Sequence, residues 1–348
     1  MGMQKSQRQD LRILIWLATA VALLPILLVN LSSVKHYLDI MIFVGIFSLV
    51  NMGLSLIMGY AGQVSLGQAA FFGLGAYVSA ILSGSFGWSP WLAMPAGMVI
   101  TGLVAGLVGV PSLKLKGHYL AMATLGFGVI MYVVFNEEIE LTGGPSGFVD
   151  IPGISIGSWD IDTPLRYYYF VWAVVFGALL FSLNVIHSRV GRALRSIHGG
   201  EAAANTMGVH TARFKLQAFV LSAVLAAAAG CLLTHYNRGI GPSEAGAMKS
   251  VRYVALVAAG GMANLCGVLA ISTVLVFLSL RGVFGSLDDA AFGAILILII
   301  SLAPRGPLEP LGAWLRRLFV RKRVREAETS GPREAGEGDV SPAGQVNP

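Results

Sequence analysis

Apolar runs of about 20 residues recur along this chain of 348 residues, and they constrain its fold more than any other feature. A helix needs about 20 mostly apolar residues to cross the hydrocarbon core of a bilayer, which is roughly 30 Å thick. The runs lie at 13–31, 37–58, 64–83, 91–110, 118–135, 165–186, 214–236, 251–280 and 285–303. We therefore expect an all-α integral membrane protein built as a polytopic helical bundle.

The composition excludes several other classes of protein. Hydrophobic residues make up 55% of the chain and charged residues only 12%, whereas soluble domains carry about 25% charge. A soluble enzyme, a disordered chain and a disulfide scaffold do not fit these values. Cys231 and Cys266 both lie in apolar runs without metal-ligand spacing, so we interpret them as small buried hydrophobes.

The positions of the charges predict the orientation in the membrane. Lys and Arg concentrate in cytoplasmic loops of membrane proteins. Residues 1–12, the loop 188–212 and the start of the tail 304–348 are basic, whereas the loop 136–164 is acidic. We therefore expect a cytoplasmic N-terminus, a transmembrane domain over 13–303, a periplasmic loop at 136–164 and a cytoplasmic tail. The net charge of +6 then belongs to this membrane pattern and not to nucleic-acid binding. The end of the tail is rich in Gly, Pro, Ser and Glu, which predicts disorder.

A cytoplasmic tail requires an even number of crossings. One straight helix over 251–280 would place the tail on the wrong side, but Gly260 and Gly261 interrupt that run. The run then forms either a re-entrant pair or two short spans. The sequence accordingly predicts eight crossings plus a re-entrant element, or ten.

Two glycine-rich segments predict breaks in membrane helices. Gly59, Gly62 and Gly67 interrupt the first, and Gly260 and Gly261 interrupt the second. Glycine weakens a helix by about 1 kcal/mol relative to alanine and also permits close helix packing. Two such segments are the pattern that an inverted repeat around a central pathway predicts.

Polar uncharged residues lie in or beside these breaks and are the candidates for a substrate pathway. They are Gln63, Ser65, Gln68, Thr124 and Asn264. Polar side chains that line a broken helix suit a zwitterion that must not be held tightly. The alternative for each residue is a hydrogen bond that joins two helices.

The loop 188–212 predicts a short amphipathic helix, because Val190, Leu194 and Ile197 recur at helical spacing. Glu201-Ala202-Ala203-Ala204 would begin a second short helix that ends near Gly208. Small residues on a cytoplasmic helix allow it to dock into a groove of another protein. The alternative is a solvated basic loop without a partner.

Several motifs, taken in order, resemble the permease subunits of bacterial branched-chain amino acid ABC importers, specifically the M-type Liv permease family. The resemblance covers roughly residues 37–306. The matching motifs are Gly59-Tyr60-Ala61-Gly62-Gln63-Val64-Ser65-Leu66-Gly67, Thr142-Gly143-Gly144-Pro145-Ser146-Gly147, Gly191-Arg192-Ala193-Leu194-Arg195, Glu201-Ala202-Ala203, Met207-Gly208-Val209 and Pro304-Arg305-Gly306.

The resemblance implies a transport subunit without an ATPase site, metal or cofactor of its own. Its partners would be a second related permease, two cytoplasmic ATP-binding subunits and a periplasmic substrate-binding protein. The loop 188–212 would contact an ATP-binding subunit. Its coupling residues would be Arg192, Arg195, Glu201, Ala202, Ala203 and Gly208. The chain departs from the family pattern at Gln68, where many relatives have His. The solute stays open between branched-chain amino acids, urea, amides and aromatic acids.

A self-sufficient secondary carrier or channel is the alternative function. Proton-coupled carriers usually need an ionisable relay inside the membrane. Here Arg252 and Asp288, like the other charged residues of the apolar runs, are expected near segment ends. The sequence also contains no Gly-Lys-Ser/Thr phosphate loop. Both observations favour a gate that another chain powers.

Overall fold

The computed structural model describes residues 34–115, 117–156, 159–161, 163–281 and 288–302. The predicted first span at 13–31, the N-terminal segment 1–12 and the tail 304–348 lie outside these residues. The described part is almost entirely helical, which confirms the expected all-α class.

The first half of the described chain contains four long helices. The elements, in order, are α2 (Val34–Ser55), a π-helical turn η1 (Leu56–Tyr60), α3 (Gln68–Gly84), α4 (Pro90–Ser112), α5 (His118–Glu137), α6 (Ile139–Thr142), a 3-10 turn η2 (Gly144–Ser146), β1 (Phe148–Val149), β2 (Ser155–Ile156) and β3 (Trp159–Asp160). The predicted run 64–83 begins as a helix only at Gln68.

The second half contains two more long helices and several shorter ones. The elements are α7 (Pro164–His187), α8 (Arg189–Gly199), α9 (Glu201–Thr206), α10 (Thr211–Asn237), β4 (Gly239–Ile240), a 3-10 turn η3 (Pro242–Ala245), α11 (Ala247–Gly260), α12 (Leu265–Leu280) and α13 (Asp288–Leu302). The strands form two small antiparallel pairs, β1 with β4 and β2 with β3.

Five helices of the described chain are long and apolar enough to cross a membrane, and their bounds agree with five predicted spans to within a few residues. They are Tyr37–Tyr60, Pro90–Ser112, His118–Glu137, Pro164–His187 and Thr211–Asn237. Gln68–Gly84 and Leu265–Leu280 are shorter apolar helices. The described part of the chain is therefore a polytopic bundle.

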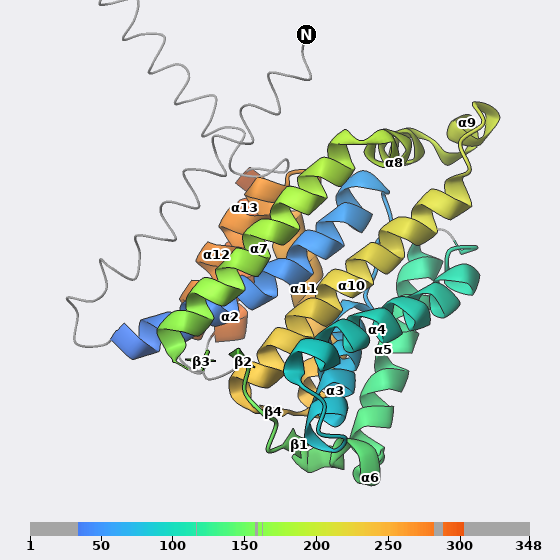
Figure 1. The fold of residues 1–348 in the computed structure, drawn as a ribbon. Coiled ribbons are helices and arrows are strands. Elements are labelled where there is room, and N and C mark those ends of the chain that lie inside the picture. The colour runs from blue at the N-terminus through green and yellow to red at the C-terminus, as the bar shows by residue number, and fades with distance from the viewer. Residues whose placement is uncertain (1–33, 116, 157–158, 162, 282–287, 303–348) are drawn as a thin grey trace, which may run out of the picture. The chain divides into compact units, whose positions relative to one another are not determined.

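The centre of the bundle is formed by α2 and α10, which lie side by side (Figure 1). In the apolar 18-residue windows of these two spans 89% and 72% of the residues are buried, against 22% in the window of α5. Glycine allows the helices to approach closely. A Cβ at Gly75 of α3 would lie 2.5 Å from the Cα of Ala227, and a Cβ at Gly230 of α10 would lie 2.0 Å from the carbonyl oxygen of Phe72. Such small-residue contacts replace the hydrophobic effect as the source of packing between membrane helices.

α11 and α12 form an antiparallel hairpin. Gly260 approaches the backbone of Val268 beside the turn, and Arg252 donates a hydrogen bond to Ser279 farther from it. The run 251–280 is therefore broken at Gly261, as predicted. With 14 and 16 residues the helices are about 21 and 24 Å long, shorter than a hydrocarbon core of roughly 30 Å. Both predicted crossing numbers include such a hairpin.

The acidic loop 136–164 is tied to the ends of the neighbouring helices. β1 pairs with β4, and the indole of Trp91 donates to the carbonyl oxygen of Ser155 at 2.8 Å. His235 lies 2.9 Å from Ser79 and 2.8 Å from the carbonyl oxygen of Pro152, so it joins α10, α3 and the loop. These strands lie at the end of the bundle opposite α8 and α9 (Figure 1).

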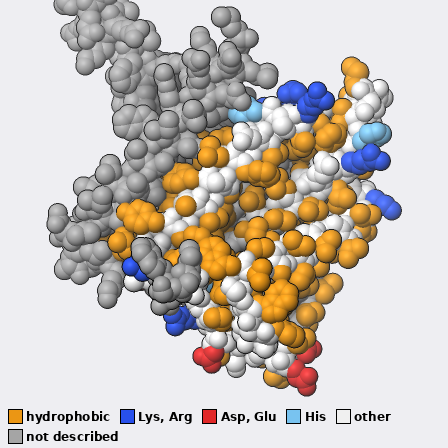
Figure 2. All heavy atoms as spheres, in the orientation of Figure 1, with side chains coloured by type: hydrophobic (Ala, Val, Ile, Leu, Met, Phe, Trp, Pro, Cys, Tyr) orange, Lys and Arg blue, Asp and Glu red, His pale blue; other side chains and the backbone are white. Residues whose placement is uncertain are grey.

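Charge separates between these two ends (Figure 2). Lys, Arg and His side chains gather at the end formed by α8 and α9, and the visible Asp and Glu side chains lie at the opposite end. Smaller basic patches lie lower on the same face. A broad hydrophobic surface extends between the ends.

Candidate functional site

The two glycine-rich breaks lie against each other, although some 200 residues separate them in the sequence. The hydroxyl of Ser55 donates to the carbonyl oxygen of Met262 at 2.7 Å. The hydroxyl of Tyr60 donates to the carbonyl oxygen of Ala263, also at 2.7 Å. A Cβ at Gly59 would lie 1.9 Å from the Met262 oxygen, so only glycine allows this approach. The residues 59–67 and 261–264, which we call the paired breaks, form one site.

The five glycines predicted to break helices serve different local purposes. Gly62 and Gly261 have positive φ angles of +67° and +86°, which disfavour side chains with a Cβ. Gly67 and Gly260 do not have positive φ angles, but each lies close to the backbone of another residue, Thr124 and Val268 respectively. Gly59 lies within the π-helical turn η1 and therefore does not end a helix.

The helices that lead into the paired breaks, α2 and α11, run in the same direction. The rings of Phe47 and Tyr253 lie 6.1 Å apart, and eight or nine residues later Ser55 meets Met262. α2 and α11 therefore approach their breaks in parallel. An inverted repeat would place them antiparallel, so these two segments do not form the inverted pair that their spacing suggested.

Four of the five candidate pathway residues line the first break, and all four are buried. Gln68 donates to the hydroxyl of Ser222, and the hydroxyl of Thr124 accepts a hydrogen bond from the backbone of Leu66 at 2.9 Å. Within the described chain, the Gln63 and Gln68 carbonyl oxygens and the Ser65 hydroxyl make no hydrogen bond. Gln68 thus joins α3 to α10, and Thr124 joins α5 to the first break. Each glutamine and Ser65 keeps a polar atom for another partner.

Asn264, the fifth candidate, caps a helix. Its carbonyl oxygen accepts a hydrogen bond from the backbone N–H of Gly267 at 3.0 Å, in the first turn of α12. Asn and Asp are the best residues for this role. The structure therefore brings Asn264 into the paired breaks, but uses its oxygen to begin the helix.

The predicted amphipathic helix in the loop 188–212 is α8. Leu194 and Ile197 are buried and Val190 is half-buried, as the spacing indicated. Arg192 and Arg195 donate to the carbonyl oxygens of His187 and Ile186. These carbonyls end α7, so the two arginines fix α8 at the end of that helix.

The predicted second short helix is α9. Ala202 and Ala203 are exposed on it, and Gly208 has a φ of +81° in the turn that follows. Glu201, however, faces the protein. Its carboxylate lies 2.6 Å from the ammonium of Lys215, whose side chain is 6% exposed. Lys215 is a residue that sequence reasoning missed as a partner, because no periodicity extends across the turn at Gly208.

A cavity of about 160 Å³ connects this loop to the first break. Gly62 and Gln63 line one side, and His198, Glu201 and Lys215 line the other. A Cβ at Gly62 would lie 2.8 Å from the Nδ1 atom of His198. The loop 188–212 therefore contacts the paired breaks directly, through His198 and the Glu201–Lys215 ion pair.

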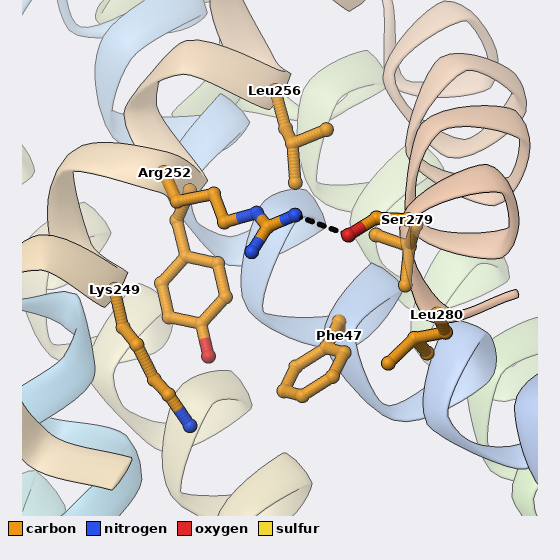
Figure 3. A pocket seen from close by; sticks show the side chains of 8 residues that line it. Phe47, Lys249, Arg252, Leu256, Ser279 and Leu280 are labelled. Carbon is orange, nitrogen blue, oxygen red and sulfur yellow. Dashed lines mark hydrogen bonds between the residues drawn. The ribbon is translucent and has the colours of Figure 1, made fainter. Parts of the chain in front are cut away.

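A second cavity of about 160 Å³ lies between α2, α11 and α12 and contains charged groups (Figure 3). Arg252 and Lys249 extend from α11, and Phe47 of α2 faces them. Phe47 lies near the midpoint of the span Tyr37–Tyr60. Arg252 lies near the start of α11, as expected, but this helix begins inside the bundle, where Ser250 accepts a hydrogen bond from the first turn of α3.

No metal centre is built from the described residues. In that part of the chain, no three His, Cys, Asp or Glu side chains lie close enough together to hold an ion. Cys231 and Cys266 are buried in helices, as their surroundings in the sequence predicted.

Residues 36–300 match the family model described as "Branched-chain amino acid transport system / permease component". Among curated proteins, the chain is 29% identical over 294 residues to the high-affinity branched-chain amino acid transport system permease protein LivM of Salmonella typhimurium. The same protein of Escherichia coli strain K12 is also 29% identical, and in both cases 78% of this chain and 69% of the relative are covered.

A different permease of the same kind of system is also similar to the chain. LivH of Salmonella typhimurium is 24% identical over 282 residues, with 75% of this chain and 91% of the relative covered. No solved structure matches the chain.

Proposed function

Because the chain belongs to the permease-component family of branched-chain amino acid transport systems, we propose that it is one of two permease subunits of an ABC importer. In this role it passes branched-chain amino acids or similar small amino-acid-like solutes inward. ATP hydrolysis on two cytoplasmic ATP-binding subunits drives the movement, and a periplasmic binding protein delivers the solute.

The observation that supports a gate driven from outside the chain is the contact between the loop 188–212 and the paired breaks. α8 and α9 lie at the basic end of the described bundle, which the charge rule assigns to the cytoplasm. His198 contacts Gly62 there, and Glu201 pairs with Lys215 at the start of α10. A displacement of the loop would therefore act first on Gly62, next to the candidate pathway residue Gln63, and on α10, whose Ser222 accepts a hydrogen bond from Gln68.

The surface for the ATP-binding subunit would be the outer side of α9. Ala202 and Ala203 are exposed there, whereas Glu201 is turned toward Lys215. Small exposed side chains allow a helix to enter a groove of another protein. In this proposal the alanines make the contact between subunits, and Glu201 holds α9 in position.

The relatives support a pair of permeases. The curated proteins named LivM and LivH are both described as permease proteins of a branched-chain amino acid transport system. The second permease of this importer would be a chain of the same family. The acidic end with the loop 136–164 would face the periplasm and receive the binding protein.

Replacing Ala202 and Ala203 with arginine tests the proposed contact. The variant should remain in the membrane, but the ATP-binding subunit should no longer co-purify with it, and uptake should be lost. Serine at both positions is the matched control, because it keeps the side chains small, and it should preserve both properties. Uptake and co-purification that survive the arginine variant would contradict the proposal.

A self-sufficient carrier remains the second candidate, and one observation favours it. Arg252, Lys249 and Glu244 form the type of intramembrane charge cluster that carriers use, and the sequence had placed no such cluster inside the membrane. The chain reconstituted alone in vesicles distinguishes the two functions. Concentration of a solute without ATP or partners would support the carrier and contradict the importer.

A further inference from the structure

The cavity beside Phe47 combines charged groups with apolar walls at the depth of the bilayer. The polar side consists of Lys249, Arg252, Tyr253 and Ser279, and the apolar walls are Phe47, Leu256, Val276 and Leu280. Arg252 donates to Ser279 and lies over the ring of Phe292, 4.5 Å from its centroid. Lys249 pairs with Glu244 at 2.5 Å.

Charges at this depth require an explanation. A charged side chain near the bilayer centre is costly, and such residues almost always face a protein interior or a water-filled cavity. The side chains of Lys249 and Glu244 are nevertheless 34% and 22% exposed on the described chain. We therefore expect this face of α11 and η3 to be turned away from lipid. It lines an aqueous pathway or a space enclosed with another subunit.

The cavity has groups for each part of an aliphatic amino acid. A guanidinium carries five N–H donors in a planar fork that suits a carboxylate, and a lysine ammonium carries three more. The Glu244 carboxylate does not line the cavity itself, but it pairs with Lys249 at the edge of the cavity and suits an ammonium group. Phe47, Leu256 and Val276 supply an apolar surface for a branched side chain.

The size of the cavity is also appropriate. Its volume of about 160 Å³ is close to that of an engineered apolar cavity of about 150 Å³ that binds benzene. A solute with a short aliphatic side chain matches this space, whereas a large aromatic or peptide ligand exceeds it.

We propose that this cavity binds the transported solute, a small zwitterion with an aliphatic side chain, during its passage through the membrane. Arg252 receives the carboxylate, and Phe47, Leu256 and Val276 contact the side chain. Glu244, which pairs with Lys249 beside the cavity, receives the ammonium group. This proposal rests on the proposed importer and assigns the solute a place within it.

The test measures binding of radiolabelled L-leucine to the purified complex of the full chain with its partner subunits, without the periplasmic binding protein. Leaving that protein out removes its own selectivity from the measurement. The wild-type complex should bind leucine and should prefer it to L-leucinamide, which lacks the carboxylate. Arg252→Gln should weaken leucine binding about tenfold or more, the loss expected for a hydrogen bond to a charged group, and should narrow the preference over leucinamide.

Arg281→Gln is the matched control for charge. Arg281 follows α12 in the same hairpin, where it lies over the ring of Tyr37 and outside the cavity. Its removal should leave leucine affinity and the preference over leucinamide unchanged.

A second variant tests the apolar end of the cavity through the ratio of leucine binding to alanine binding. Loss of folded protein does not change this ratio, because it reduces both kinds of binding equally. Val276→Phe fills the space beside Phe47 and should reduce leucine binding much more than alanine binding. Val274→Phe is the control, because Val274 lies on the same helix but is 58% exposed. It should leave the leucine-to-alanine ratio unchanged.

Three results would overturn the inference. In the first, Arg252→Gln binds leucine as tightly as the wild type and prefers it to leucinamide as strongly, and Val276→Phe keeps the wild-type ratio of leucine binding to alanine binding. The second is loss of the partner permease from Arg252→Gln with leucine binding intact, which would make the cluster a subunit contact. The third is a wild-type complex that transports leucine with its binding protein but binds none without it. A complex that transports no such solute at all would instead contradict the proposed function.

Discussion

At the scale of single residues, the candidate site depends on contacts that only small side chains allow. Gly59 meets the carbonyl of Met262, and Gly62 meets the ring of His198. These contacts bring three segments together that are far apart in the sequence. The sequence predicted both helix breaks and close packing at these glycines, but it could not assign one role to each, because a glycine in a close contact and a glycine in a turn look alike in the sequence.

Gly59→Ala tests the contact between the paired breaks. The new Cβ would lie 1.9 Å from the Met262 carbonyl oxygen, so backbone must move, and we expect a loss of stability of about 1–3 kcal/mol. Thermal unfolding of the detergent-solubilised protein measures the change. Gly106→Ala is the control, since no atom lies within 4 Å of the new Cβ, and it should stabilise α4 slightly. Equal melting temperatures for the two variants would argue against a tight contact.

The Glu201–Lys215 pair gives a second prediction at this scale. Lys215→Met leaves the Glu201 carboxylate without its partner and should release α9 from α10, which lowers uptake while the chain stays in the membrane. Combining Glu201→Lys with Lys215→Glu should restore part of the uptake, because the pair can form again. Arg213→Gln, at an exposed position of the same helix, serves as the control. A double variant no better than Lys215→Met would exclude a role for the ion pair in positioning α9.

At the scale of elements, the sequence predicted the long helices well. Apolar runs of about 20 residues have few alternatives to membrane helices, so α4, α5, α7 and α10 begin and end within a few residues of the predicted bounds. The hairpin of α11 and α12 was partly predicted from Gly260 and Gly261.

Two features of these elements could not be predicted from hydropathy. α11 begins inside the bundle after the turn η3, which places Arg252, near the start of that helix, beside Phe47. The meeting of the two breaks depends on tertiary packing across some 200 residues. Neither feature leaves a periodic signal, because a sequence window contains only one of the segments at a time.

The start of α12 provides a prediction for the hairpin. Asn264→Ala removes the oxygen that accepts the Gly267 N–H and should cost about 1 kcal/mol of stability. Asn264→Asp keeps an acceptor and should retain most of it. Melting temperatures of the two variants, compared with the wild type, measure the difference. An alanine variant as stable as the aspartate variant would show that the cap contributes little.

At the scale of the whole molecule, the described helices link a basic end, where α8 and α9 lie, to an acidic end with β1 to β4. The paired breaks contact the loop at the basic end, and the cavity beside Phe47 lies farther along the same helices. This order fits a gate that a cytoplasmic partner opens and closes. In the proposed importer, the chain would contribute the pathway and its partners would contribute the energy.

We propose that another subunit powers this gate, and reconstitution in sealed vesicles provides the decisive test. The chain, its partner permease, the ATP-binding subunits and the periplasmic binding protein should together accumulate radiolabelled leucine only when ATP is on the cytoplasmic side. The same vesicles without the ATP-binding subunits should accumulate none. Accumulation of leucine by vesicles that contain this chain alone would contradict the account.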